Sequence, residues 1–400
     1  MAGRFAPRTA RQAPPHQAAT AVRGPGPRPA ARPTRPAQHP PWPATAQATP
    51  WPATAQALPG FATAQATPGS ATAQATPGST TAQATPGSTT AQATPVGPPL
   101  TREWTPPGPL DLRLVLGPLR RGPADPTFRM AADGTFWRAT RTPQGPGTLR
   151  VAARGDRVGA QAWGPGAEWL LAGLPALLGA DDDPDAFTPH HRLLAVARHR
   201  RPGLRLLRTG LVMESLIPSI LEQKVTTDEA YRAWRLLVRR YGTPAPGPTA
   251  ALGLHVMPDA RTWAMIPSWE WHKAGVDTKR SSTILRAVRV APRLEEASAM
   301  PLPEATARLQ LIPGIGPWTS AETLQRSNGA PDAITVGDYH LPSIVGHALA
   351  DNRHADDEEM LTLLTPYEGQ RHRATRLILL AGRIPERRGP RMTPGNIASL

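Results

Sequence analysis

A nine-residue stretch from Leu311 to Thr319 constrains the fold of this chain more than any other feature. It reads Leu-Ile-Pro-Gly-Ile-Gly-Pro-Trp-Thr and lies between two segments with helical spacing of apolar residues. Two glycines two positions apart let a backbone turn sharply and approach a ligand closely, and Pro317 suits the first position of a helix. We therefore predict a hairpin between two helices. The amides of Gly314, Ile315 and Gly316 would converge on an anion there; the alternative is a plain helix connector.

A single acidic residue follows this hairpin at the start of another predicted helix. Asp338 stands in Val-Gly-Asp-Tyr, about twenty residues beyond the glycines. A helical stripe continues after it through Leu341, Ile344, Val345 and Ala348. A carboxylate in this place caps the helix, and it also stabilises positive charge that develops on a substrate. The two roles are compatible, and we predict both.

Together these motifs resemble the helix–hairpin–helix "GPD" superfamily of DNA glycosylases, and within it the 3-methyladenine DNA glycosylase II type. The resemblance covers roughly residues 200–382 and includes Ile220-Leu-Glu-Gln-Lys-Val225. It implies a mostly α fold with a small N-terminal antiparallel β domain, and a base flipped out of DNA into a pocket. It also implies base excision repair of alkylated purines. The alternatives are a glycosylase for another damaged base and a module that binds lesions without excising them.

The resemblance assigns roles to individual residues. Asp338 matches the catalytic aspartate. Trp318 stands where strand-cleaving relatives carry a Schiff-base lysine, which implies a monofunctional enzyme without lyase activity. The Trp318 ring lines the base pocket or packs the hairpin. DNA contacts are implied for Gly314, Ile315, Gly316, Thr319, Gln223 and Lys224, and pocket positions for Trp318, Tyr367 and Glu322.

Three of these positions leave a choice open. Glu322 stands where a relative has a pocket aromatic, which predicts a more polar pocket. Lys224 stands where that relative wedges an apolar residue into the DNA gap. Lys224 either fills the gap with its stem, contacts a phosphate or acts as a displaced amine nucleophile. Tyr367 is a pocket aromatic or an ordinary surface tyrosine.

The residue types call for no cofactor. The chain contains no cysteine, which excludes disulfides, thiolate zinc sites and cysteine-ligated iron–sulfur clusters. The family resemblance does suggest a monovalent cation, Na⁺ or K⁺, held by the backbone carbonyls of Gln310, Ile312 and Ile315. Backbone ligands leave no residue pattern, so the sequence does not test this site.

Composition divides the chain into four parts. Residues 1–101 contain copies of a nine-residue Ala-Thr-Ala-Gln-Ala-Thr-Pro-Gly-Ser repeat without an apolar face, so we predict a disordered tail. We predict an α+β domain at residues 102–186, the helical glycosylase domain at residues 187–386 and a second disordered tail at residues 387–400.

The net charge of +15 favours a polyanionic partner, although a coding bias toward arginine is the alternative explanation. Residues 1–99 hold seven arginines and no acidic residue. No apolar run reaches the ~18–20 residues that span a bilayer, and the N-terminus does not read as a secretory signal. We expect a monomeric, cytoplasmic, nucleoid-associated protein that binds double-stranded DNA containing damaged bases.

Further predictions concern single elements. Alternation and turn residues predict a strand at Leu112–Leu116 and hairpins at 127–139 and 149–162. Asp181–Asp185 is predicted to be a solvated loop. Trp263, Trp269 and Trp271 are predicted to be core residues. Helices are predicted at 167–178, 303–311, 317–327, 338–350, 356–364 and 369–382, with a capping box opening another at Thr226-Thr-Asp-Glu229.

Overall fold

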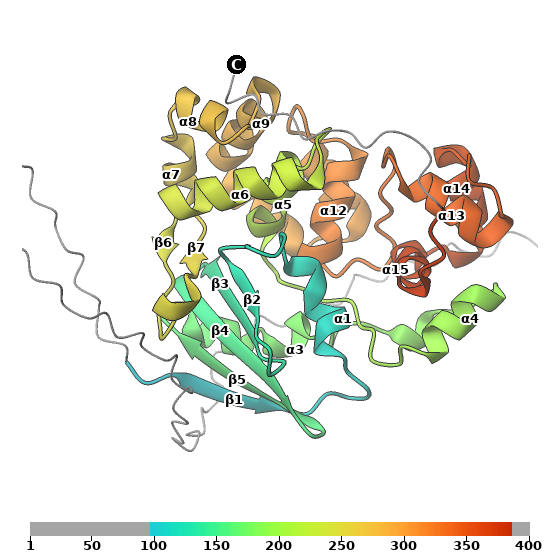
Figure 1. Ribbon diagram of the computed structural model, residues 1–400, viewed down its shortest axis with the longest axis horizontal. Helices are drawn as coiled ribbons and strands as arrows, with labels where there is room; N and C mark the ends of the chain where they lie inside the picture. The colour runs from blue at the N-terminus through green and yellow to red at the C-terminus, as the bar shows by residue number, and fades with distance from the viewer. Residues whose placement is uncertain (1–96, 386–400) are drawn as a thin grey trace, which may run out of the picture. The chain divides into compact units, whose positions relative to one another are not determined.

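A five-stranded antiparallel sheet forms the first folded part of the chain, in the order β1-β5-β4-β3-β2 (Figure 1). The computed structural model describes residues 97–385, so the two predicted disordered tails lie almost wholly outside the described residues. The strands are β1 (Leu100–Trp104), β2 (Phe128–Met130), β3 (Phe136–Thr142), β4 (Gly145–Arg154) and β5 (Arg157–Trp163). The first two residues of β1 therefore fall within the predicted N-terminal tail, which was expected to end at residue 101.

Both predicted hairpins are confirmed. In the first, β2 pairs with β3 with Phe128 opposite Arg138; in the second, β4 pairs with β5 with Leu149 opposite Ala162. Side chains alternate between the two faces of each strand, and Leu149, Ala160 and Ala162 are among the residues that fill the core beneath the sheet. Two short helices pack there as well, α2 (Ala167–Ala172) and α3 (Leu174–Leu177), with a break at Gly173.

The strand predicted at Leu112–Leu116 is wrong, because this segment is helix α1. Asp111 caps it, and its Oδ1 accepts the N–H groups of Arg113 at 2.8 Å and Leu114 at 3.2 Å. The buried residues Leu112, Val115 and Leu116 are spaced for one helical face rather than for a strand. A 3-10 turn, η1 (Gly117–Leu119), follows and brings the chain toward the helical region.

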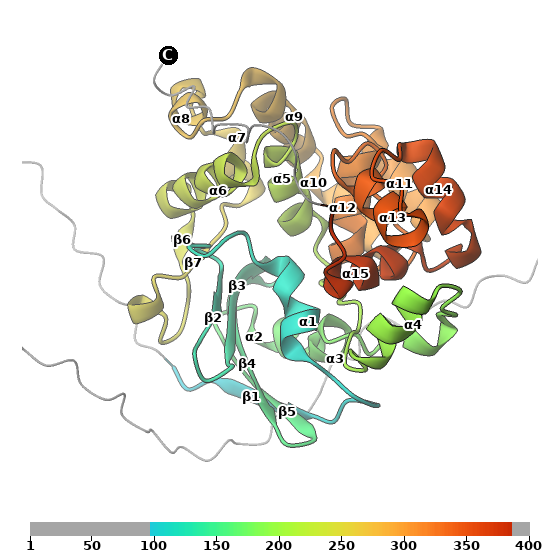
Figure 2. The same cartoon turned by 45° about the vertical axis from the view of Figure 1, so that its right-hand side comes forward.

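The rest of the described chain is mostly helical (Figures 1 and 2). It carries two large hydrophobic cores and contributes to a small cluster with Ala139 of the sheet. The helices are α4 (Arg192–His199), α5 (Val212–Leu221), α6 (Thr227–Tyr241), α7 (Ala260–Ala264), α8 (Ser268–Lys273), α9 (Thr278–Arg289), α10 (Ala291–Glu295), α11 (Leu302–Gln310), α12 (Pro317–Ser327), α13 (Leu341–Ala350), α14 (Asp357–Leu364) and α15 (Arg371–Ala381). A two-stranded ribbon, β6 (Thr243–Pro244) and β7 (His255–Val256), and short 3-10 turns at 184–186, 250–252, 296–299 and 365–367 connect them.

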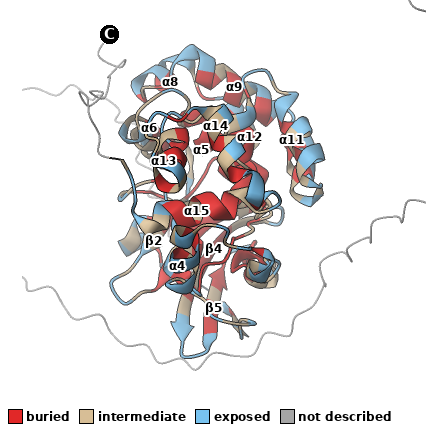
Figure 3. Cartoon of the chain, turned by 90° about the vertical axis from the view of Figure 1, so that its right-hand side faces the viewer, coloured by how far each residue is buried: buried red, intermediate tan, exposed pale blue. Residues whose placement is uncertain are grey.

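The two helical cores have different members. The larger core takes buried side chains from α5 through α12, with α5 and α12 at its centre (Figure 3). The second core joins α4 to α13, α14 and α15. The chain crosses from the first core to the second after α12, in the segment that contains Asp338. That crossing places the predicted catalytic carboxylate at the boundary between the two cores.

Three smaller predictions are corrected. Trp269 is 61% exposed, whereas Trp263 and Trp271 are buried and stacked with ring centroids 5.7 Å apart. Asp182, predicted in a solvated loop, is buried because it pairs with the buried Arg373 of α15. The helix predicted from 338 begins at Leu341. The other helices predicted from 303 to 382 are present, with ends shifted by at most two residues.

A capping box starts α6, as the sequence predicts. Thr226 Oγ1 accepts the N–H of Glu229 at 3.3 Å, and Glu229 Oε2 accepts the N–H of Thr226 at 2.7 Å. We expect Thr226→Ala to lower the free energy of unfolding by about 0.5–2 kcal/mol, measured by urea denaturation. Thr227→Ala is the matched control, because Thr227 is exposed and makes no capping contact. Equal losses in both variants would contradict the capping role.

Candidate active site

The hairpin between α11 and α12 spans residues 311–316 and depends on its first glycine. Gly314 has φ 101°, in the left-handed region that favours glycine. A Cβ at Gly314 would also collide with the Thr283 hydroxyl on α9. The amide of Ile315 donates to Ile312 O at 3.0 Å, so it closes the turn rather than facing a ligand.

The start of α12 leaves backbone donors open. No side chain caps this helix, since its N-cap residue is Gly316. The first N–H groups of a helix have no partner within the helix, and their dipole favours an anion. Thr319, predicted to contact DNA, is only 2% exposed, and its hydroxyl accepts the side-chain amide of Gln223 at 2.8 Å.

Gln223 ties the end of α5 to the hairpin. Its Nε2 donates to Gly314 O at 2.9 Å and to Thr319 Oγ1 at 2.8 Å. The next residue, Lys224, is exposed and has φ 54°, an uncommon conformation for a residue with a side chain. Gln223 thus holds the loop against the hairpin, and Lys224 projects from that loop.

Arg286 of α9 adds a positive charge to the hairpin, which the sequence reading missed. Its Nη1 donates to Pro313 O at 2.8 Å. This contact lies next to the predicted cation site. Pro313, whose carbonyl Arg286 binds, follows Ile312, and Ile312 O itself accepts the N–H of Ile315. Of the three predicted ligands, the Ile312 carbonyl thus also accepts a backbone N–H, and no step of the chemistry is assigned to a cation.

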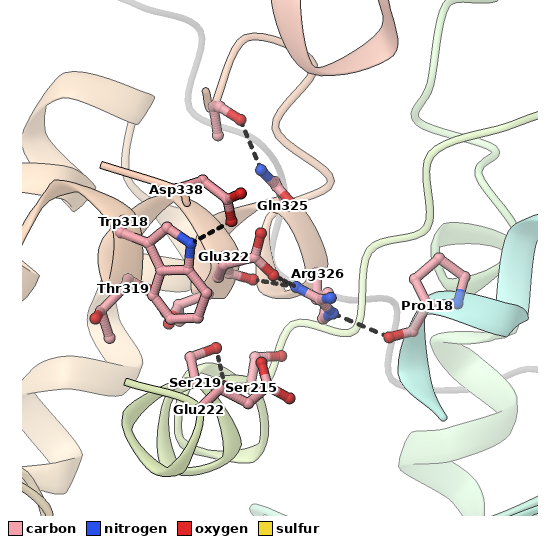
Figure 4. Close-up of polar contacts among 12 residues, drawn as sticks. Pro118, Ser215, Ser219, Glu222, Trp318, Thr319, Glu322, Gln325, Arg326 and Asp338 are labelled. Carbon is pink, nitrogen blue, oxygen red and sulfur yellow. Dashed lines mark hydrogen bonds and ion pairs between the residues drawn. The ribbon is translucent and has the colours of Figure 1, made fainter. Parts of the chain in front are cut away.

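Three N–H donors hold the carboxylate of Asp338, and Figure 4 draws the one from Trp318. Oδ1 accepts from the amides of His340 and Leu341, both at 2.8 Å; since His340 is the N-cap residue of α13, Asp338 binds the start of the helix from two residues before the predicted capping position. Oδ2 accepts the indole Nε1–H of Trp318 at 2.9 Å. The carboxylate is partly exposed. Trp318 therefore connects the first turn of α12 directly to Asp338, a contact that no sequence pattern indicates.

Trp318, Glu322 and Arg326 lie on one face of α12, each about one helical turn after the one before it (Figure 4). Arg326 Nη1 donates to Glu322 Oε2 at 2.8 Å, and Arg326 Nε donates to Pro118 O at 3.0 Å. The turn after α1 thereby reaches the helical region. The side chain of Glu322 is 17% exposed.

A cavity of about 240 Å³ opens along this face of α12 and extends to α15. That volume lies below the ~300–1,000 Å³ typical of drug-sized ligand sites, so it suits a smaller group. It is lined by Pro118, Leu206, Leu207, Glu322, Gln325, Arg326, Thr335, Leu341, His372, Thr375, Arg376 and Leu379. Leu341 lines the cavity and donates its amide to Asp338 Oδ1, whereas Asp338 and Trp318 themselves are not among the lining residues.

Tyr367 does not join this group. It is 4% exposed and belongs to the second helical core. Its ring stacks on Phe187 with centroids 5.6 Å apart and an interplanar angle of 16°. Its burial in that core also rules out the alternative of an ordinary surface tyrosine. Among the predicted pocket residues, only Trp318 and Glu322 lie together near Asp338 (Figure 4).

Comparison with known proteins finds similar sequences and similar folds. A curated protein of Mycobacterium tuberculosis, described as a probable bifunctional transcriptional activator/DNA repair enzyme AlkA, is 30% identical over 227 residues. The match covers 54% of this chain and 45% of that protein, so the chain spans about half the length of the curated relative it matches. No family model matches the chain.

Solved structures share the fold. A 3-methyladenine DNA glycosylase from Archaeoglobus fulgidus has a TM-score of 0.59 at 15% identity, covering 70% of this chain and 98% of its own. An 8-oxoguanine glycosylase/lyase from Clostridium acetobutylicum, bound to double-stranded DNA, has a TM-score of 0.55 at 13% identity, covering 68% and 92%. The chain therefore has the fold of helix–hairpin–helix DNA glycosylases, as the sequence resemblance implied.

Burial of His372 makes the stability of the fold sensitive to pH. His372 is 5% exposed, and burial, reinforced by Arg376, Arg326 and Arg373, lowers its pKa well below 6.5. Below pH 6.5 the unfolded chain binds a proton at this residue that the folded chain does not bind. The contribution of His372 to the free energy of unfolding therefore falls as pH falls, by at most about 1.4 kcal/mol per pH unit.

We expect His372→Gln to reduce this loss on acidification. The measurement is urea denaturation of wild type and variant at pH 7.5, 6.5 and 5.5, with the exposed His199→Gln as control. As the pH is lowered from 7.5 to 5.5, the free energy of unfolding of His372→Gln should fall less than that of the wild type. An identical pH dependence in all three proteins would show that His372 titrates normally in the folded state.

Proposed function

We propose that this chain is a DNA glycosylase that hydrolyses the N-glycosidic bond of damaged purine nucleotides in double-stranded DNA. One observation carries the proposal: the carboxylate of Asp338 is fixed by Trp318, which belongs to the helix that begins at the glycine hairpin. The anion-binding turn and the reacting carboxylate are thus parts of one rigid unit. The DNA repair names of the relatives support the same reaction.

DNA binding starts at the hairpin. The open amides at the start of α12 and the guanidinium of Arg286 suit a backbone phosphate. Contacts of this kind position a protein on DNA without reading sequence. The exposed Lys224, held near the hairpin by its neighbour Gln223, is suited either to the gap left by a flipped nucleotide or to a phosphate.

The carboxylate then acts on the sugar of the flipped nucleotide. Departure of the base leaves positive charge on C1′ and the ring oxygen, and the Asp338 carboxylate stabilises that charge. Water adds through its oxygen to C1′, and Asp338 accepts the proton. An alkylated purine carries positive charge before the reaction, so it leaves as a neutral base without a proton donor. We therefore take alkylated purines of the 3-methyladenine type as the substrate class.

The proposal includes monofunctional chemistry. Trp318 occupies the position of the amine nucleophile in strand-cleaving relatives, and an indole cannot form a Schiff base. Trp318 instead donates a hydrogen bond to Asp338. The product is then an abasic site in an intact strand.

None of the helices described between residues 97 and 385 has the length and the apolar surface needed to span a membrane.

Asp338→Asn tests the catalytic role. We expect base release from methylated duplex DNA to fall by a factor of about 10³ or more, because the amide has no negative charge to offset the developing cation. Asn retains an oxygen that can cap α13, so the fold and DNA affinity should change little. Asp357→Asn is the control, since Asp357 also contacts this loop through the amide of Gly337 but does not face Trp318.

Two results would overturn this account in different ways. Undiminished release by Asp338→Asn would exclude Asp338 as the reacting carboxylate. Release by neither wild type nor variant, with retained binding to damaged DNA, would favour the module that binds lesions without excising them.

Borohydride trapping tests the monofunctional assignment. We expect no covalent protein–DNA adduct when borohydride is added during turnover, because no amine attacks C1′. A known glycosylase/lyase serves as the positive control in the same assay. An adduct that disappears in Lys224→Ala would identify Lys224 as a displaced nucleophile and refute the hydrolytic mechanism.

A further inference from the structure

The part of α9 beside the hairpin carries charge of one sign only. Residues 278–294 contain five basic residues and no acidic one. Two of the five, Arg280 and Arg293, pair with carboxylates that lie outside this segment. The other three are exposed and form no ion pair with any described residue: Lys279, Arg286 and Arg289.

These three cations share the side of α9 that meets the hairpin. Lys279 and Arg286 are seven residues apart, and Arg289 follows three residues later, spacings that keep side chains on one helical face. Thr283 lies between them on that face; it is 3% exposed, and its hydroxyl lies against Gly314. The hairpin therefore covers the middle of this face, with positive charge on both sides of it along the helix.

Two hydrogen bonds fix α9 against the segments proposed to contact DNA. Arg286 Nη1 donates to Pro313 O of the hairpin at 2.8 Å. Near the other end of the helix, the buried Arg280 donates from Nη1 to the carbonyl of Leu221, the last residue of α5, at 2.9 Å. Lys224 follows Leu221 by three residues, so the first turn of α9 is joined to the segment that carries Lys224.

Helix stability does not account for a lysine at position 279. Lys279 is the second residue of α9, after the N-cap Asp277 and Thr278. The positive end of a helix dipole disfavours a cation in the first turn. The carboxylate of Asp277 is already bound to Arg280, whose amide donates at 2.9 Å and whose Nε donates at 2.7 Å. An external anion at Lys279 would be favoured by both the ammonium group and the helix end.

We propose that α9 is a second DNA-contact element, in which Lys279 and Arg289 bind backbone phosphates on the two sides of the phosphate held at the start of α12. The ten residues from Lys279 to Arg289 span about 15 Å of helix, the axial length of about four nucleotides of one strand. Such contacts position DNA without reading its sequence. This inference rests on the proposed function, because the phosphate at the hairpin sets where the duplex lies.

The salt dependence of DNA binding tests these contacts. Fluorescence anisotropy gives the dissociation constant of the full-length chain for a short undamaged duplex at a series of salt concentrations. Each phosphate contact that is lost lowers the slope of log K against log salt by about 0.9. We expect this fall for Lys279→Gln and for Arg289→Gln, and about twice the fall for the double variant. Lys279→Arg keeps the charge and should retain the wild-type slope.

Arg200→Gln is the matched control. It removes one exposed arginine at the end of α4, a helix that lies away from α9 (Figures 1 and 2). The seven arginines of residues 1–99 are present in every protein compared, so differences in slope come from the substitutions. Urea denaturation of Lys279→Gln should give the wild-type midpoint or a higher one, because the lost charge stands at the positive end of α9.

Three results would count against these ideas. A double variant with the wild-type slope overturns the inference. An equal fall in slope for Arg200→Gln overturns it as well, since the effect would then follow net charge alone. If the α9 variants lower the slope as expected but the wild type releases no damaged base, the proposed glycosylase function fails while the DNA contacts of α9 stand.

Discussion

The hydrogen bond from Trp318 to Asp338 is the contact on which the site depends. It joins α12 of the larger helical core to the segment that leads into the second core. Without it, only the two amides at the start of α13 would orient the carboxylate. Because α12 begins at the glycine hairpin, the same helix fixes the phosphate-binding turn and the reacting group at a set separation.

The hairpin itself is held by contacts from other elements. Gly314 leaves room for Thr283 of α9, and Gln223 and Arg286 bind its carbonyls from α5 and α9. Gln223 was expected to contact DNA, and Thr283 and Arg286 were not singled out. In the structure Gln223 and Arg286 bind backbone carbonyls of the protein. The cavity is lined from two helices. Glu322 and Arg326 line it from α12, and Arg376 lines it from α15.

Local sequence patterns predicted the parts of this structure that local forces determine. The glycine spacing predicted the hairpin, turn residues predicted both sheet hairpins, and the capping pattern predicted the start of α6. The segment Leu112–Leu116 was misassigned because its four apolar residues around Arg113 resemble a strand, while Asp111 and the spacing of the buried residues favour a helix. Contacts between distant residues, such as the hydrogen bond from Arg376 to Leu114 O, leave no pattern in the sequence, and Tyr367 was placed by resemblance alone.

The single-turnover rate constant of Trp318→Phe tests the central claim most directly. Phenylalanine keeps an aromatic ring but has no N–H, so it removes the hydrogen bond to Asp338 while retaining most of the packing. The rate of base release should fall about tenfold or more, with the dissociation constant for the same DNA changed by about twofold or less, because a positioning contact affects the reacting group rather than binding. An unchanged rate would show that Asp338 does not need Trp318, and the account of the site would be wrong.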